Sequence, residues 1–161
     1  MTTIVVMGVA GSGKSTVGRA LAARLGATFV DADDHHSAEA LAAMSAGRAL
    51  TDDEREPWLR RVRDELIAHA STGVVLACSA LTARARSLLT DGLDDVRLVW
   101  LTGDPALIAS RLQRRAGHPV GPALLPSQLA TLEPPHGALA LDVADPPDVL
   151  VERIASWLTA A

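Results

Sequence analysis

The residues with the clearest chemical meaning form a glycine-rich run at positions 8–15. They match the spacing G-x-x-x-x-G-K-[ST] at every fixed position, which is the pattern of a P-loop (Walker A). Glycines let backbone N–H groups turn inward around a phosphate, and the lysine carries a mobile charge to the β- and γ-phosphate oxygens. We predict that nucleotide phosphates are bound by Gly8, Ala10, Gly11, Ser12, Gly13, Lys14, Ser15 and Thr16. The alternative, a glycine-rich turn without a ligand, is disfavoured by the complete match.

Two aspartates, Asp31 and Asp33, follow the second predicted strand, on the same sheet edge as the phosphate loop. A kinase that uses ATP and Mg²⁺ needs one carboxylate near the metal's water shell. It needs another to orient the attacking hydroxyl or to take its proton. We assign Ser15 and Asp31 to the metal, and Asp33, together with Lys14, to catalysis. Either aspartate could instead cap the helix that follows.

Side chains for an anionic or polyhydroxylated acceptor are expected in the segments that follow strand ends. His36, Arg55 and Arg86 lie in such segments, and arginine suits bidentate recognition of a carboxylate. We predict that these residues bind the substrate together with Asp33. The alternative for each arginine is a solvated surface charge paired with a nearby acidic residue.

A second group of arginines precedes the least regular part of the chain. Arg111 and Arg115 are four residues apart in a predicted helix that reaches about position 115, so they lie on one face. An arginine that arrives on closure can neutralise the oxygens of the phosphoryl group. We therefore assign both to catalysis, and Arg111 also to the nucleotide. The Gly- and Pro-rich segment 117–135 is a candidate lid, which places the moving region around 111–135. An ordinary basic helix face is the alternative.

Short apolar runs alternate with segments of helical period along the whole chain. Strands are predicted at 4–7, 28–30, 74–78, 96–101 and 138–143, with helices between them. Pro57 is expected in the first turn of the third helix or just before it. This alternation predicts an α/β fold: a three-layer P-loop NTPase domain with a five-stranded parallel sheet and helices on both faces. At 161 residues, the chain 1–161 suits a single domain.

Composition restricts the partners and the compartment. The formal net charge is −4 and no block of Lys or Arg appears, so attraction to nucleic acid or an anionic membrane is not expected. Cys78 is the sole cysteine, which fits a reducing cytosol, and we read it as a small core residue. The sequence shows neither a signal peptide nor an apolar run of about 18 residues, which predicts a cytoplasmic protein.

Several stretches resemble the gluconokinases, small P-loop kinases that phosphorylate D-gluconate. The segment 31–36 is similar to their D-G-D-x-x-H motif, and the similarity continues through L-T-D-D-E-R-x-P-W-L at 50–59, C-S-A-L at 78–81, and the arginine, S-Q and L-E-P segments between 110 and 134. The resemblance implies ATP-dependent transfer to the 6-hydroxyl of gluconate, a fold shared with shikimate and adenylate kinases, and a homodimer. It also implies that Ser79 contacts the substrate and that Asp145 and Pro146 pack on the nucleotide base.

This chain departs from the gluconokinase pattern at several positions, which are Ala32, Ser37, Ala40, Ala43, Thr82, Ala85 and Pro119. Thr82 stands where the family has a lysine and Pro119 where it has an aromatic residue, so the identity of the acceptor stays open. The alternatives are another kinase of this fold, such as a shikimate or nucleotide kinase, or a nucleotide-binding relative with little turnover. A GTPase switch is disfavoured because the chain contains no Asn for an N-K-x-D motif.

Overall fold

Five short apolar strands form one parallel sheet at the centre of the structure, a computed structural model that describes residues 1–115 and 122–161. Along the sheet the strand order is β2-β3-β1-β4-β5, and all four pairings are parallel. The strands are β1 (Thr3–Met7), β2 (Thr28–Asp31), β3 (Val74–Ala77), β4 (Val96–Thr102) and β5 (Leu139–Asp142). The predicted fold class is thereby confirmed.

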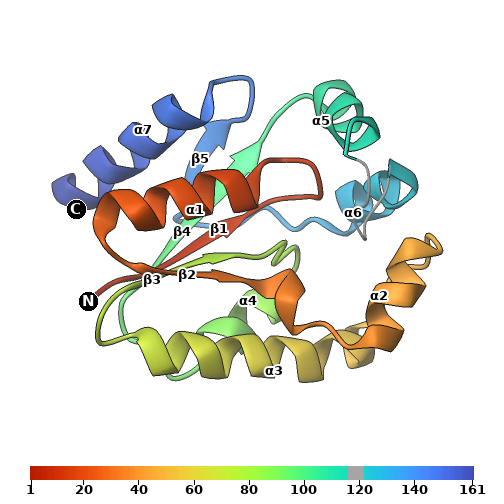
Figure 1. The fold of residues 1–161 in the computed structure, drawn as a ribbon, viewed down its shortest axis with the longest axis horizontal. Coiled ribbons are helices and arrows are strands. Elements are labelled where there is room, and N and C mark those ends of the chain that lie inside the picture. The colour runs from red at the N-terminus through yellow and green to blue at the C-terminus, as the bar shows by residue number, and fades with distance from the viewer. Residues whose placement is uncertain (116–121) are drawn as a thin grey trace.

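Helices cover both faces of the sheet (Figure 1). They are α1 (Lys14–Leu25), α2 (Ala38–Ser45), α3 (Asp52–His69), α4 (Ala83–Thr90), α5 (Pro105–Gln113), α6 (Leu125–Thr131) and α7 (Pro147–Ala160), with 3₁₀ turns η1 (Ala32–His35) and η2 (Pro122–Leu124). The side chains of β1 alternate between two cores: Ile4 and Val6 pack with α1, α5 and α7, whereas Val5 and Met7 pack with α3 and α4. β1 and β3 are buried along their whole length, which is why the sequence shows nearly continuous apolar runs there.

The register of the strands brings three chain segments to one edge of the sheet. Ala77 of β3 lies opposite both Val6 of β1 and Asp31 of β2. Because parallel strands end at the same edge, the phosphate loop, the acidic segment and the turn after β3 become neighbours there. This is the edge where open α/β sheets bind ligands.

Three local predictions are corrected by the structure. Pro57 lies inside α3, beyond the first turn, because the capping box of Thr51 and Glu54 starts this helix at Asp52. Helix α5 ends at Gln113 with Arg114 as its C-cap, so Arg115 does not share the helix with Arg111. The segment predicted to be irregular contains α6. The part of the predicted lid at 116–121, including Pro119, lies outside the described residues.

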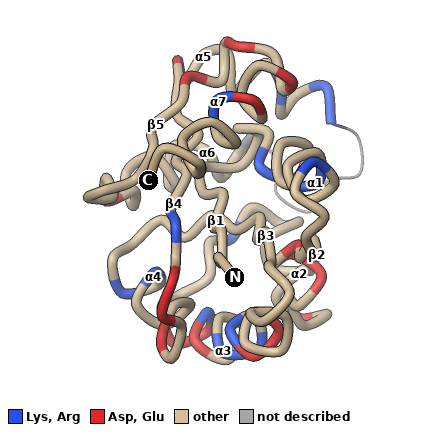
Figure 2. Tube along the Cα trace, turned by 90° about the vertical axis from the view of Figure 1, so that its left-hand side faces the viewer, with Lys and Arg blue, Asp and Glu red and all other residues tan. Residues whose placement is uncertain are grey.

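Charged residues of both signs are interspersed along α3 (Figure 2). Arg60 pairs with Glu56 at 2.7 Å, and Arg84 of α4 reaches the same carboxylate at 3.1 Å. These exposed ion pairs make the surface of α3 polar, and each contributes little to the stability of the fold. No helix within the described ranges is both long enough and apolar enough to cross a bilayer.

Candidate active site

The phosphate loop between β1 and α1 has the backbone that its glycines allow. Gly11 and Gly13 adopt φ angles of 81° and 92°, a region that side chains other than glycine rarely tolerate. A Cβ on Gly11 would lie 2.6 Å from Leu112 Cγ, so this glycine also permits close packing against α5. Nothing lies within 4 Å of a Cβ built on Gly13, which leaves open space in front of the N-terminus of α1. That space suits an anion, because the helix dipole and free N–H groups point into it.

Lys14 begins α1, and its ammonium Nζ donates to the Val9 carbonyl at 3.0 Å across the loop. Burial lowers the pKa of Lys14 from its ordinary value, and the charge of Arg115 lowers it further, whereas Asp33 opposes the shift. A polyanion in the loop would add to the counter-charge that Asp33 supplies to this desolvated ammonium. Ser12 Oγ is buried and has no hydrogen-bond partner among the described residues.

Asp31 uses its two carboxylate oxygens for two different contacts. Oδ2 accepts a hydrogen bond from Ser15 Oγ at 2.8 Å, and Oδ1 accepts one from the Asp33 backbone N–H at 3.0 Å. The second contact caps η1, so the cap and the contact with the phosphate loop are not exclusive alternatives. By capping η1, Asp31 also fixes the backbone from which the Asp33 side chain extends.

His36 lies on the wall beside Asp33 and is almost completely buried, with 3% of its side chain exposed. Its ring stacks on the indole of Trp58 with centroids 4.0 Å apart, and its Nε2 lies 3.8 Å from Asp33 Oδ1. Burial lowers the pKa of His36 to about 4, with the charges of Arg61 and Arg55 acting in the same direction. The imidazole is therefore neutral at physiological pH, and its buried Nδ1 has no partner among the described residues.

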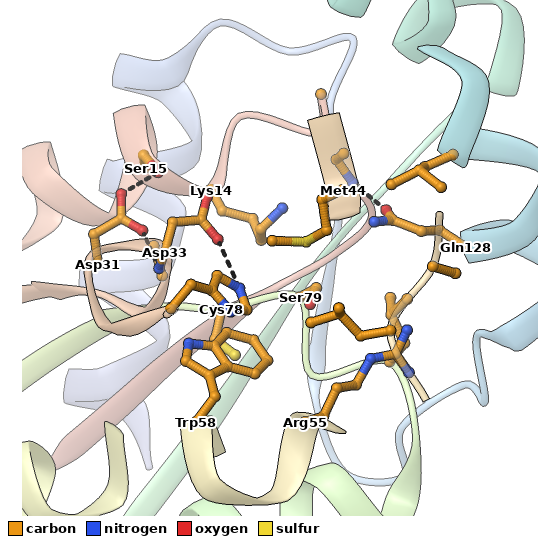
Figure 3. A pocket seen from close by; sticks show the side chains of 18 of the residues that line it. Lys14, Ser15, Asp31, Asp33, Met44, Arg55, Trp58, Cys78, Ser79 and Gln128 are labelled. Atoms are coloured by element: carbon orange, nitrogen blue, oxygen red, sulfur yellow. Dashed lines mark hydrogen bonds and ion pairs between the residues drawn. The ribbon is translucent and has the colours of Figure 1, made fainter. Parts of the chain in front are cut away.

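A single cavity joins these groups (Figure 3). Its free space, counting the solvent-open mouth, is about 810 Å³. Its wall combines the phosphate loop with acidic, basic and aromatic side chains and includes Gly11, Lys14, Ser15, Asp31, Asp33, Met44, Arg55, His36, Trp58, Cys78, Ser79, Arg115 and Gln128. Cys78 is part of the buried wall, and burial raises the pKa of its thiol to about 12, which excludes a thiolate nucleophile at neutral pH.

A second hollow lies on the other side of the phosphate loop. It is lined by loop residues and by the segment after β5, including Gly11, Ser12, Gly13, Thr16, Arg111, Arg115, Asp145 and Pro146. Arg111 donates to the Val143 carbonyl at 2.7 Å, and Asp145 pairs with Arg153 at 2.9 Å. Arg115 lines both hollows, so it lies where they adjoin.

Not every predicted substrate residue reaches the cavity. Arg55 and Ser79 line it, and Arg55 also lies 3.8 Å from the Asp52 carboxylate. Arg86 does not belong to the described wall. Its guanidinium donates to the Ala80 carbonyl at 2.9 Å and to the Glu133 carbonyl at 3.0 Å, so it supports the turn that carries Ser79. Ala80 has a φ of 45°, and the bond from Arg86 helps to hold this unusual backbone.

Comparison with known proteins agrees with this architecture. The family model for shikimate kinase matches residues 10–132. The thermosensitive gluconokinase of Escherichia coli is 43% identical over 136 residues, which cover 83% of this chain and 72% of the relative. The chain belongs to the gluconokinase family. Within the solved structures, a gluconokinase from Sinorhizobium meliloti is 39% identical with a TM-score of 0.83, covering 98% of this chain and 95% of its own. An unliganded sugar kinase from a Janibacter species is 39% identical with a TM-score of 0.92. The match covers 100% of this chain and 96% of the Janibacter chain.

Two residues that line the cavity, Trp58 and Gln128, were not predicted from the sequence to belong to the site. Trp58 donates from Nε1 to the Ala32 carbonyl at 2.6 Å and supports His36. Gln128 accepts a hydrogen bond from the Ala10 backbone N–H at 2.7 Å. Both residues lie in stretches that resemble gluconokinases, at 50–59 and 127–134, and this resemblance was the only signal that pointed to them.

Proposed function

We propose that this protein is an ATP-dependent gluconokinase that transfers the γ-phosphate of ATP to the 6-hydroxyl of D-gluconate. The observation that carries the proposal is the single cavity in which the phosphate loop faces Asp33, His36 and Arg55. The close relatives named gluconokinase support the same acceptor. In the reaction, the hydroxyl oxygen bonds to the γ-phosphorus, the bond to the bridging oxygen of ADP breaks, and the hydroxyl proton leaves.

Asp33 is placed to take that proton. Its carboxylate faces the cavity beside His36, and Asp31 holds its backbone in position. A carboxylate in this position orients the hydroxyl towards the phosphate and accepts its proton as the new bond forms. The neutral imidazole of His36, which stacks on Trp58, provides a rigid neighbour for the acceptor's hydroxyl groups.

The phosphates are bound by the N–H groups of the loop, by Lys14 and by Thr16, while Asp145 and Pro146 flank the base. Arg111 and Arg115 line the hollow beside the loop and supply positive charge near the transferred group. Arg115 lines both hollows, which favours a contact with the phosphoryl group as it moves between its two partners.

Mg²⁺ fits the oxygen donors that the structure brings together. Ser15 Oγ and Asp31 Oδ2 lie 2.8 Å apart at the mouth of the phosphate loop, and both are hard donors that this ion prefers. Among the described residues no group of at least 3 His, Cys, Asp or Glu side chains could hold a metal without help. This agrees with an ion held by the Ser15 hydroxyl, by water molecules near Asp31 and by substrate phosphates. When bound, Mg²⁺ neutralises negative charge on the phosphate oxygens.

On the acceptor side, Arg55 is the expected partner of the carboxylate of gluconate, and Ser79 adds a hydroxyl from the turn after β3. Two departures from the gluconokinase pattern lie next to this region. Thr82 caps α4 through Ala85 N–H, and Thr82 and Ala85 line a smaller hollow that shares Arg55 and Ser79 with the main cavity. An acid related to gluconate is therefore the second candidate acceptor.

Four further features of this protein are predicted from its sequence. They are a single domain over 1–161 with a lid around 111–135, a cytoplasmic location, a homodimer, and the absence of nucleic acid or membrane partners. Arg115, which belongs to the proposed lid, lines both hollows. Closure there would exclude water from the phosphoryl group and suppress hydrolysis of ATP.

An acceptor panel tests the proposed function. ATP consumption is measured with gluconate, with stereoisomers and shorter homologues of gluconate, with shikimate and with nucleoside monophosphates, and Lys14→Ala serves as the blank. We expect gluconate to give the highest kcat/KM and 6-phosphogluconate as product. Turnover with shikimate or a nucleotide in its place would overturn the gluconate assignment, and no turnover with any acceptor would indicate a binding protein.

A further inference from the structure

One hydrogen bond connects the phosphate loop to a helix far along the chain. The backbone N–H of Ala10, a loop residue with 5% exposure, donates to Gln128 Oε1 of α6 at 2.7 Å. Sequence reasoning offered no reason to connect these positions, which are 118 residues apart. The contact replaces water at a buried N–H, and a buried donor without a partner costs about 1–3 kcal/mol.

This bond also fixes which way the amide of Gln128 points. A backbone N–H can only donate, so the oxygen must face Ala10 and the NH₂ group must face away. Gln128 lines the same cavity as Asp33 and Arg55, and Figure 3 shows it across the cavity from Asp31 and Asp33. Within the described part of the chain, Nε2 makes no hydrogen bond to protein. Among the described residues, its two N–H donors are therefore available to a ligand in the cavity.

The segment that follows α6 is hydrogen-bonded to the turn that carries Ser79. Glu133 N–H donates to the Leu81 carbonyl at 2.8 Å, and Arg86 holds the Glu133 carbonyl and the Ala80 carbonyl together. Gln128 is therefore held at one end through α6 and at its side chain through Ala10. A side chain fixed in this way loses little further freedom when it binds a ligand, which favours selective recognition.

We propose that Gln128 is a specificity residue of the acceptor site, with Oε1 held by the Ala10 N–H and Nε2 donating a hydrogen bond to an oxygen of the acceptor. The chemistry suits a polyhydroxylated acid, because a neutral amide donor adds direction without the charge that Arg55 already supplies. An acceptor without that oxygen would forgo the hydrogen bond from Nε2, so the site would bind it less well than gluconate. The inference rests on the proposed function and adds a residue to its acceptor side.

Gln128→Glu separates the two contacts of this side chain. The variant keeps an oxygen for the Ala10 N–H and exchanges the donor for a second oxygen. We expect the KM for gluconate to rise about tenfold or more, the loss expected for a donor to a charged or polyhydroxylated ligand, while the KM for ATP stays close to wild type. Gln128→Met removes both contacts and is expected to raise the KM for gluconate equally and to lower the thermal midpoint as well.

The chain supplies a matched control, because its other glutamine, Gln113, is exposed at the end of α5. Gln113→Glu adds the same charge and should leave both KM values unchanged. An equal rise in both KM values for Gln128→Glu, or no rise in the KM for gluconate, would reduce Gln128 to a support of the loop and overturn the proposal. Failure of the wild type to use gluconate would instead contradict the proposed function, and the same variants are then compared with the acceptor that the panel identifies.

Discussion

The two sides of the cavity are built in different ways. On the proposed phosphate side, consecutive residues at 8–15 form one loop whose backbone N–H groups and single lysine are the predicted phosphate ligands. On the acceptor side, side chains converge from η1, α3, the turn after β3 and α6, and Arg55 and Gln128 come from opposite halves of the chain. A binding site built from backbone N–H groups allows few sequences and can bind the phosphates of any nucleoside triphosphate. In a binding site built from side chains, single substitutions can change which acceptor is bound.

The largest effect is expected on the phosphate side. Lys14 is the only lysine of the chain, so no other lysine can replace it. We expect Lys14→Ala to lower kcat by at least about 10³-fold, because the charge that follows the transferred phosphate is lost. Stopped or continuous assays of ATP consumption measure the change, and circular dichroism should show an unchanged fold. Retained turnover would remove this ammonium from the mechanism.

Asp33 stands where the two sides meet, so its loss should separate chemistry from nucleotide binding. Asp33→Asn keeps the size of the side chain and abolishes its ability to take a proton. We expect kcat to fall by roughly 10²–10⁴-fold, the usual range for a general base, with the affinity for ATP nearly unchanged. Calorimetric titration with a non-hydrolysable ATP analogue checks the affinity. If kcat is preserved, Asp33 acts only as part of the η1 turn.

A change confined to the acceptor side should leave the phosphate side untouched. Arg55→Ala is expected to raise the KM for gluconate by about 10–100-fold, the range for losing a charge-assisted hydrogen bond, without changing the KM for ATP. Arg60→Ala is the matched control, because Arg60 is on the same helix and pairs with Glu56 at the surface. If Arg55→Ala and Arg60→Ala have the same KM for gluconate, Arg55 is only a surface charge.

The smallest expected effect concerns the pH dependence of stability. His36 has a pKa of about 4 in the folded protein because it is buried, whereas an unfolded histidine titrates near its ordinary value of 6.5. Between these values the unfolded chain binds a proton that the folded protein does not, so stability falls as the pH decreases from 6.5 to 4. We expect His36→Phe, which keeps an aromatic ring against Trp58, to flatten this part of the profile in urea unfolding. The same change at the exposed His136 should not alter it.

The two sides also differ in how far the sequence predicts them. The phosphate loop follows from a complete local motif, and the strands follow from short apolar segments that alternate with segments of helical period. Gln128 and Trp58 could not be assigned in this way, since their roles depend on contacts with Ala10 and His36 that no spacing encodes. Arg86 was expected in the cavity and instead supports Ala80, because a charge after a strand end can turn to backbone carbonyls as readily as to a ligand.

Determining the structure of a ternary complex tests the central claim most directly. The protein is crystallised with gluconate and a non-hydrolysable ATP analogue, and both ligands are located in the electron density. The account predicts the triphosphate in the loop at 8–15 and gluconate in the adjoining cavity, with its 6-hydroxyl between Asp33 and the γ-phosphate and its carboxylate towards Arg55. Gluconate bound elsewhere, or oriented with its carboxylate at Asp33, would contradict it.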